Sequence, residues 1–280
     1  MSNEASRGAR RKKSLVALHW SGRPCNSWLA PGAEPGSPEY FERTEAERHR
    51  LEPFVARFAR YQDWKGKSVL EVGCGIGFDL CQFARSGARA VGVDLTAAGA
   101  ALSTQRLRHH HAPGQALVAD CEQLPFVDAT FDFVYSWGVI HHTPDTDKAA
   151  REIVRVVKPG GQVTVMIYNR RSLVALQAYL VYGLLKGRPL RRIAEIIATH
   201  LESPGTKAYT VREARGLFPS LEDVSITSVV TPYDLRIGRN RYLPHWVGSI
   251  MPQSLGYFMV IQGKKPRLER SLSESVIDAA

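Results

Sequence analysis

The chain has 280 residues, of which 44% are hydrophobic, so it can build a folded core and is not disordered throughout. Its 37 Lys and Arg against 27 Asp and Glu leave a net charge of +10, which suits a nucleic acid, an anionic membrane face or an acidic small molecule. The four cysteines form no C-x-x-C pair, so neither a zinc ribbon nor a disulfide framework is indicated, and we expect a cytoplasmic location.

The first 38 residues are rich in Gly, Pro, Ser and charge, and the run from Arg7 to Lys13 carries five positive charges. This composition predicts a basic, largely flexible segment for residues 1–38, with an arm for a nucleic acid or a lipid as the alternative. In residues 39–64, apolar side chains recur at helical intervals among charged ones. That spacing predicts a helical cap in front of the core.

Residues 65–169 alternate strand-like and helix-like stretches. The expected strands cover 68–73, 90–95, 116–120, 131–138 and 162–168, and the helices between them cover 78–86, 97–109 and 147–157. Strands that are apolar nearly throughout and separated by helices are typical of a parallel sheet covered on both faces. The predicted fold class is therefore α/β with a doubly wound sheet.

The alternation stops at residues 170–205, which we interpret as an inserted helical lid or substrate insertion. The segment Leu173–Leu185 is apolar nearly all round but shorter than the roughly 20 residues that span a bilayer, so we expect no transmembrane helix. Its surface needs a partner, which is the core, a second copy of the chain or a membrane interface. Residues 206–263 are expected to complete the sheet and supply substrate loops, and residues 264–280 to form a tail.

The first expected strand runs into the sequence Glu71-Val72-Gly73-Cys74-Gly75-Ile76-Gly77. Glycines at alternate positions allow a tight turn that brings bare backbone against a ligand at the carboxyl edge of the sheet. A dinucleotide fingerprint would need a glycine at position 78, which is Phe78, and no Gly-Lys-Ser/Thr follows as in a phosphate loop. The turn therefore indicates a nucleotide-type ligand and disfavours NAD.

Acidic residues end the next two expected strands. Asp94 lies 21 residues after Gly73, the spacing at which an acid meets the hydroxyls of a ribose. Asp120 ends the third strand, where a carboxylate can accept a hydrogen bond from an adenine amino group while the backbone after Cys121 approaches the ring. The pattern predicts a ribose at Asp94 and a purine at Asp120.

This set of residues, with Lys158-Pro159-Gly160-Gly161, resembles the class I S-adenosylmethionine-dependent methyltransferases over about residues 64–168. The block FDFVYSWGVIHHTPD at 131–145 is similar to the branch that includes ubiquinone and menaquinone C-methyltransferases and many small-molecule enzymes. The resemblance implies a Rossmann-like sheet of seven strands, one of them an antiparallel edge strand, that binds S-adenosylmethionine and releases S-adenosylhomocysteine. The cofactor contacts that we predict are Tyr40, Glu71, Gly73, Cys74, Gly75, Gly77, Asp94, Leu95, Asp120, Cys121, Ser136 and Trp137.

Candidate catalytic residues follow the fourth expected strand. Transfer of a methyl group from a sulfonium needs alignment in a dry pocket, and we expect no metal. Acidic acceptors such as phenols, thiols or enols need a base, and histidine titrates near neutral pH. We therefore take His141, His142 and Tyr168 as candidate catalytic residues; the alternative for the histidines is that they pack or hold the loop.

The sequence thus predicts a methyltransferase for a small aromatic or apolar acceptor, with a homodimer or a membrane contact through the lid as further partners. One alternative is a quinone-type lipid acceptor methylated at a membrane surface. Another is an RNA-binding or RNA-modifying enzyme, which is disfavoured because the positive charge is scattered and no RNA-binding module accompanies it. A third is a relative that binds the cofactor without catalysis.

Overall fold

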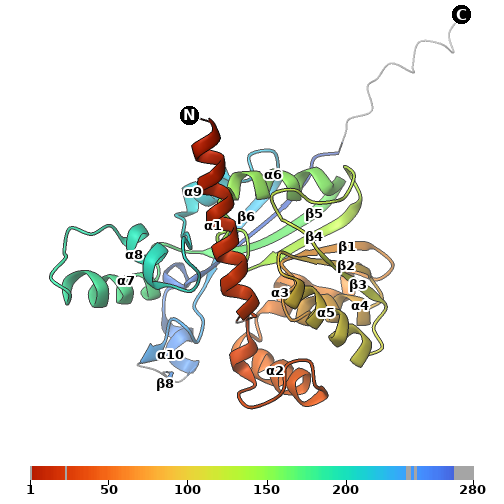
Figure 1. Ribbon diagram of the computed structural model, residues 1–280, viewed down its shortest axis with the longest axis horizontal. Helices are drawn as coiled ribbons and strands as arrows, with labels where there is room; N and C mark the ends of the chain where they lie inside the picture. The colour runs from red at the N-terminus through yellow and green to blue at the C-terminus, as the bar shows by residue number, and fades with distance from the viewer. Residues whose placement is uncertain (1, 23, 238–240, 243–244, 268–280) are drawn as a thin grey trace, which may run out of the picture.

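The computed structural model describes residues 2–22, 24–237, 241–242 and 245–267, and one seven-stranded sheet forms its centre (Figure 1). The strands lie in the order β3-β2-β1-β4-β5-β9-β6. Their bounds are β1 Ser68–Val72, β2 Arg89–Asp94, β3 Gly114–Val118, β4 Phe131–Trp137, β5 Val157–Tyr168, β6 Glu222–Val229 and β9 Phe258–Lys264. Helices cover both faces of this sheet, which confirms the predicted α/β fold class.

The strands from β3 to β5 are parallel, whereas β9 is antiparallel to its neighbours β5 and β6. The antiparallel strand predicted at the edge therefore lies one position inside the sheet, and that prediction is wrong. The apolar side chains of Met259 and Ile261 in β9 are fully buried in the core cluster that includes Leu217 and Phe218, as suits a strand inside the sheet. Strand β6 alternates more exposed and less exposed residues and can form the edge.

Successive residues of β1 point to opposite faces and pack beneath different helices. Val69 belongs to the cluster formed with α4 and α5, and Leu70 to the cluster formed with α6 and α9. Both side chains are fully buried, so the central strand is apolar on each side. The bounds of these helices are α4 Phe78–Arg85, α5 Ala97–His109, α6 Thr146–Val156 and α9 Val211–Gly216.

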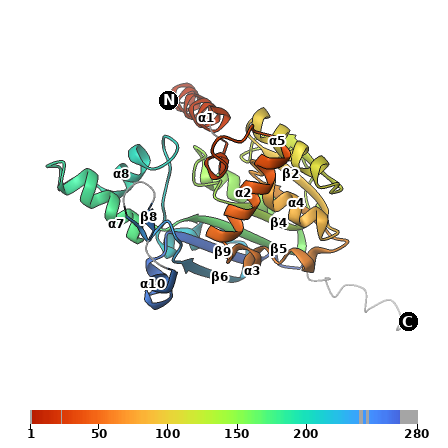
Figure 2. The same ribbon diagram turned by 90° about the horizontal axis from the view of Figure 1, so that it is seen from below.

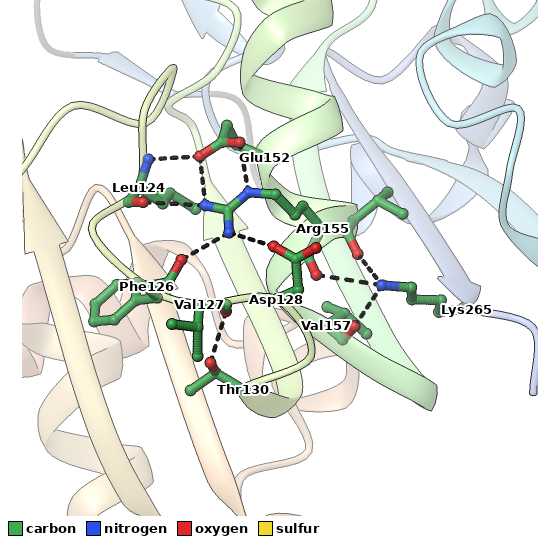
Figure 3. A network of polar contacts seen from close by, with 10 residues as sticks. Leu124, Phe126, Val127, Asp128, Thr130, Glu152, Arg155, Val157 and Lys265 are labelled. Atoms are coloured by element: carbon green, nitrogen blue, oxygen red, sulfur yellow. Dashed lines mark hydrogen bonds and ion pairs between the residues drawn. The ribbon is translucent and has the colours of Figure 1, made fainter.

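Arg155 near the end of α6 holds the loop that joins β3 to β4 (Figure 3). Its guanidinium donates hydrogen bonds to the carbonyl oxygens of Leu124 (3.1 Å) and Phe126 (2.7 Å). The carboxylate of Glu152, 2.7 Å from the Arg155 Nε, accepts a further hydrogen bond of 2.7 Å from the backbone N–H of Leu124. These contacts fix the chain just beyond the tip of β3, where the predicted purine-binding acid lies.

The N-terminal segment differs from the expectation of a largely flexible stretch, because Ser2–Gly22 forms helix α1. The helix lies across the carboxyl end of the sheet (Figures 1 and 2), where Val16 is buried and Lys13 pairs with two carboxylates of the core. Contacts with the core, which composition does not reveal, hold this helix in place. The cap follows as the 3-10 helix Ser27–Leu29, α2 Pro38–Leu51, α3 Val55–Ala59 and the 3-10 helix Tyr61–Trp64.

The segment predicted as a lid forms α7 Leu173–Tyr179, a π-helical continuation Leu180–Leu184 and α8 Ile193–His200. Both views show α7 and α8 projecting from one end of the molecule (Figures 1 and 2). Across the described ranges, no helix combines the length and the apolar character needed to cross a bilayer. Smaller elements complete the chain before β9: β7 Arg236–Ile237, β8 Arg241–Tyr242, α10 His245–Ile250 and the 3-10 helix Gln253–Leu255. Most of the predicted tail, 268–280, lies outside the described residues.

Candidate functional site

A pocket that holds about 1000 Å³ of empty space, part of it open to solvent, lies at the carboxyl ends of β1, β2 and β4. The predicted cofactor contacts that line it are Glu71, Gly73, Cys74, Gly75, Asp94, Leu95, Asp120, Cys121 and Trp137, and the predicted catalytic residue that lines it is His142. The topology therefore brings together most of the residues that the sequence analysis selected.

The glycine turn after β1 has a backbone that other residues rarely adopt. Gly73 and Gly77 have φ angles of 79° and 76°. A Cβ on Gly73 would lie 2.2 Å from the side chain of Val139, and one on Gly77 would lie 2.7 Å from the Cα of Ser103. Both positions thus need glycine for their conformation and for the close approach of neighbouring chain segments.

Asp94 at the tip of β2 braces this turn. Its Oδ2 accepts a hydrogen bond of 2.9 Å from the backbone N–H of Gly75, and its Oδ1 accepts from the N–H and the hydroxyl of Thr96 at 2.8 and 2.7 Å. A carboxylate offers about four acceptor positions, so three are used within the protein. One acceptor position is left, and because Asp94 lines the pocket, this position suits a ligand hydroxyl.

Glu71 lies in β1, two residues before Gly73, and is 4% exposed. Its Oε2 has no hydrogen-bond partner among the described residues, although it lines the pocket. Burial, helped by the negative charge of Asp79, holds the pKa of Glu71 well above its usual value. An unpaired buried carboxyl oxygen of this kind is a natural partner for a ligand ammonium group.

Arg48, in cap helix α2, also lines the pocket, and the sequence analysis did not select it. Its Nη2 lies 2.9 Å from the Oδ2 of Asp79, and the Oδ1 of the same carboxylate accepts a hydrogen bond from the hydroxyl of Tyr61. Burial would lower the pKa of Arg48, but the charges of Asp79 and Glu52 outweigh it and raise the pKa well above its usual value. Arg48 therefore stays charged at the floor of the pocket.

Helix α1 covers the other end of the pocket with residues that the sequence analysis treated as part of a flexible segment. Lys13 Nζ pairs with Asp120 and lies 2.6 Å from the Oε2 of Glu122. Val16, one turn after Lys13 in α1, and Trp20, two turns after it, line the pocket. The ring of Trp20 lies 5.3 Å from the ring of His142. The spacing of these three residues along one helix face was the signal available in the sequence.

His142 contacts the end of the lid segment through both ring nitrogens. Its Nδ1 is 2.9 Å from the hydroxyl of Ser203, and its Nε2 is 3.2 Å from the Oε2 of Glu202. Each carboxylate oxygen of Glu202 also accepts from the hydroxyl of Tyr168 at 2.7 Å. Loss of water around Glu202 opposes its ionisation, but the contacts with His142 and Tyr168 outweigh it and lower its pKa.

Glu202 is thus a candidate functional residue that the sequence analysis missed. It has a φ of 52°, in the left-handed region that a residue other than glycine rarely occupies. Backbone strain of this kind is retained where the surrounding structure, and often function, requires it. No local pattern of residues around position 202 signals this contact.

The remaining predicted site residues lie behind the pocket wall. His141 is fully buried, and burial, with the charges of His142 and Lys207, lowers its pKa well below the usual value, so the ring is neutral. Tyr168 stacks on Tyr257 at 4.1 Å and is joined to the pocket through Glu202. The other residues outside the lining are Tyr40, which packs with Ile76, the fully buried Ser136, and Gly77 at the end of the turn.

The comparison with protein families agrees with this geometry. Residues 70–165 match the family model described as a methyltransferase domain. The parallel strands β1 to β5, the glycine turn and the acids at the strand tips lie within or directly beside that match, whereas β6 and β9 lie outside it. This part of the chain is therefore similar to a methyltransferase domain.

The curated relatives are methyltransferases of small molecules. The chain is 35% identical over 98 residues to a sterol 4-C-methyltransferase of Caenorhabditis elegans, which covers 34% of this chain and 29% of that protein. It is 36% identical over 151 residues to phthiotriol/phenolphthiotriol dimycocerosates methyltransferase 1 of Mycobacterium ulcerans, at 53% and 48% coverage. A ubiquinone/menaquinone biosynthesis C-methyltransferase of Idiomarina loihiensis is 29% identical over 153 residues, which cover 53% of this chain and 60% of that protein. The chain thus matches less than two thirds of the length of these relatives.

Solved structures show the same fold over nearly the whole chain. A geranyl diphosphate C-methyltransferase from Streptomyces coelicolor, in complex with Mg2+, geranyl diphosphate and S-adenosylhomocysteine, has a TM-score of 0.58 at 19% identity and covers 91% of this chain and 98% of that one. A magnesium protoporphyrin IX methyltransferase from Synechocystis with bound S-adenosylhomocysteine also has a TM-score of 0.58, at 13% identity. The match covers 90% of this chain and 99% of that one. At these identities the likeness concerns the fold.

Proposed function

We propose that this chain is an S-adenosylmethionine-dependent methyltransferase for a small, apolar or aromatic acceptor. The observation that carries the proposal is the arrangement of Glu71, Asp94 and Asp120 at successive strand tips around a glycine turn, all lining one pocket. The domain match over residues 70–165 supports it. S-adenosylmethionine, when bound, supplies a methyl carbon on a positively charged sulfur that an acceptor removes by in-line displacement.

The residues of the pocket fit the parts of that cofactor. The unpaired Oε2 of Glu71 would accept from its amino group, and the free acceptor position of Asp94 would take a ribose hydroxyl. Asp120, although paired with Lys13, has acceptor positions left for the adenine amino group. Arg48, held charged by Asp79, would neutralise a carboxylate near the floor of the pocket.

Alignment of the reacting groups requires that water be kept out of the pocket. Helix α1 lies over it through Val16 and Trp20, and Trp137 forms part of the opposite wall. Aromatic faces stabilise a nearby positive charge through cation–π attraction. We infer that Trp20 and Trp137 serve the sulfonium and an apolar acceptor in this way.

For an acceptor that must lose a proton, we infer that His142, or Glu202 behind it, could take that proton. His142 lines the pocket, and Glu202, with its lowered pKa, is ionised at neutral pH. His141 is neutral and fully buried, so we assign it to packing beside Tyr168, at a ring distance of 3.9 Å. Tyr168 then acts as a support for Glu202.

The nature of the acceptor is suggested by the relatives, whose names refer to sterols, phthiotriols and quinones. All these are apolar ring-bearing or lipid-like molecules, which fits a pocket walled by Val16, Trp20 and Trp137. A quinone-type lipid acceptor at a membrane surface is the second candidate, favoured by the exposed leucines of the lid. Dimerisation through the lid, a cytoplasmic location and a reaction without metal stay predictions.

The proposal is tested by incubating the protein with S-adenosylmethionine that carries a labelled methyl group and with panels of phenols, thiols and lipid quinones. We expect label in at least one apolar acceptor, and less label at limiting S-adenosylmethionine when Asp94 is replaced by alanine. If calorimetry detected no binding of S-adenosylhomocysteine and no acceptor were labelled, the proposed activity would be rejected.

A further inference from the structure

The lid helix buries its small residues and exposes its large ones. In α7 and its π-helical continuation, Ala175 and Ala178 are buried, and a Cβ on Gly183 would lie 3.0 Å from Tyr179 and 3.4 Å from Ile196 of α8. The exposed side chains, with their exposed fractions, are Leu176 50%, Leu180 43%, Val181 44%, Leu184 45%, Leu185 80% and, in the following turn, Leu190 96%. A helix that packs on its own core has the opposite arrangement.

The exposed leucines form one continuous stripe. Leu176, Leu180 and Leu184 are spaced by four residues, and Val181 and Leu185 form the adjacent row. Soluble monomers rarely expose large contiguous apolar patches without a partner. The stripe lies on the part of the molecule that projects furthest from the sheet in both views (Figures 1 and 2).

The same segment is strongly basic. Residues 170–194 contain six Lys and Arg and no Asp or Glu. Lys186, Arg188 and Arg192 are exposed in the turn between the two helices, and no carboxylate in the part of the chain that the structure describes pairs with them. An apolar stripe bordered by unpaired positive charge matches the boundary between the acyl chains and the headgroups of an anionic bilayer.

We propose that residues 176–192, here called the lid tip, dock on an anionic lipid surface. The leucine stripe enters the acyl boundary, and Lys186, Arg188 and Arg192 contact headgroup phosphates. A second copy of the chain fits this surface less well, because two lid tips would bring the same positive charges together without a carboxylate to offset them. The interaction is peripheral and does not cross the bilayer.

The lid connects this surface to the pocket. Helix α8 has 8 residues, about 12 Å at the usual rise, and the chain directly after it carries Glu202 and Ser203, which contact His142. A lid tip on the bilayer thus holds the pocket near the membrane surface, where an apolar acceptor is concentrated. Only this role in acceptor delivery rests on the proposed function, because docking itself requires no methyl transfer.

The test is cosedimentation of the full chain with vesicles of phosphatidylcholine alone and of phosphatidylcholine mixed with phosphatidylglycerol. Two double variants change the lid tip: the leucine pair, Leu184→Ser with Leu185→Ser, and the arginine pair, Arg188→Gln with Arg192→Gln. A third double variant, Arg10→Gln with Arg11→Gln, is the control for the basic helix α1. Val127→Ser, at a 78% exposed residue of the β3–β4 loop, controls for loss of an exposed apolar side chain elsewhere. Circular dichroism and calorimetry with S-adenosylhomocysteine verify that each variant is folded and binds the cofactor product.

We expect the unmodified chain to bind to the anionic vesicles only. The leucine pair should weaken this binding about tenfold or more, the arginine pair should also weaken it, and both controls should bind like the unmodified chain. Absence of binding by the unmodified chain, or full binding by the leucine pair, would overturn the docking proposal. A concentration-dependent dimer in sedimentation velocity that the leucine pair abolishes would also overturn it, because a second copy would then cover the stripe. Since cofactor binding is measured separately, any of these results leaves the methyltransferase proposal standing.

Discussion

The carboxylate of Asp94 at the tip of β2 accepts a 2.9 Å hydrogen bond from the backbone N–H of Gly75 in the turn after β1. One side chain thus joins the two strands whose ends frame the pocket. The same carboxylate accepts from the backbone N–H of Thr96, the residue that caps α5. Turn, cap and proposed ribose contact therefore depend on a single residue.

Asp94→Ala is expected to weaken S-adenosylhomocysteine about tenfold or more, because the ligand contact and the brace on the glycine turn are lost together. The free energy of unfolding should fall by about 1–2 kcal/mol as the N–H groups lose their acceptor. Isothermal calorimetry and urea unfolding measure the two effects. Unchanged affinity in a folded variant would contradict the assignment of Asp94.

Glu71 should make cofactor binding depend on pH. Its raised pKa keeps the buried carboxyl protonated in the free protein at pH values where an ordinary glutamate is ionised. An ammonium group that binds beside it favours the carboxylate, so binding releases a proton and affinity rises with pH towards that pKa. Calorimetry of S-adenosylhomocysteine in buffers of different ionisation enthalpy counts the protons.

Glu71→Gln is the matched variant, since it keeps the shape of the side chain and cannot titrate. We expect it to abolish the proton release and the rise of affinity with pH. Proton release of the same size in Glu71→Gln would show that another group, such as Asp79, carries the effect.

Lys13 should slow the release of the product from the pocket. Its pairing with Asp120 and Glu122 fastens α1 over the adenine end. The substitution Lys13→Met removes this charge pairing and is expected to raise the dissociation rate of S-adenosylhomocysteine several-fold, to about tenfold at most. Stopped-flow fluorescence of the pocket tryptophans measures that rate. Lys12→Met, at an exposed neighbour on the same helix, is the control, and equal rates in the two variants would argue against the fastening role.

Glu202 should matter for turnover more than for cofactor affinity. Glu202→Gln removes the charge that holds His142 and Tyr168, and we expect kcat to fall about tenfold or more while the Kd of S-adenosylhomocysteine changes less than about twofold. Glu213→Gln, which breaks an exposed ion pair with Arg170, is the control. A parallel loss in kcat and affinity would instead indicate that Glu202 only holds the lid in place.

The sheet and the cofactor side of the pocket could be predicted because their signals are local. The glycine turn and the acids each follow a strand directly, and parallel strands bring their carboxyl ends to one edge of the sheet. The position of the antiparallel strand could not be derived in this way, because β9 inserts between β5 and β6 through long-range pairing.

The residues that close the pocket could not be predicted because their contacts are distant in sequence. Lys13 and Asp120 are 107 residues apart, and Arg48 and Asp79 are 31 apart. The spacing of Lys13, Val16 and Trp20 places them on one helix face, but it does not indicate which surface that face contacts or which carboxylate the lysine pairs with. The same holds for Glu202, whose role depends on the fold of the lid against His142.

The central claim is that the glycine turn and the strand-tip acids bind the adenosyl cofactor, and a crystal structure with S-adenosylhomocysteine tests it most directly. The account predicts density with the ribose hydroxyls at Asp94, the amino group at the Oε2 of Glu71 and the adenine beside Asp120. Density for the ligand in any other cavity, or no density at saturating concentration in a crystal with an open pocket, would contradict it.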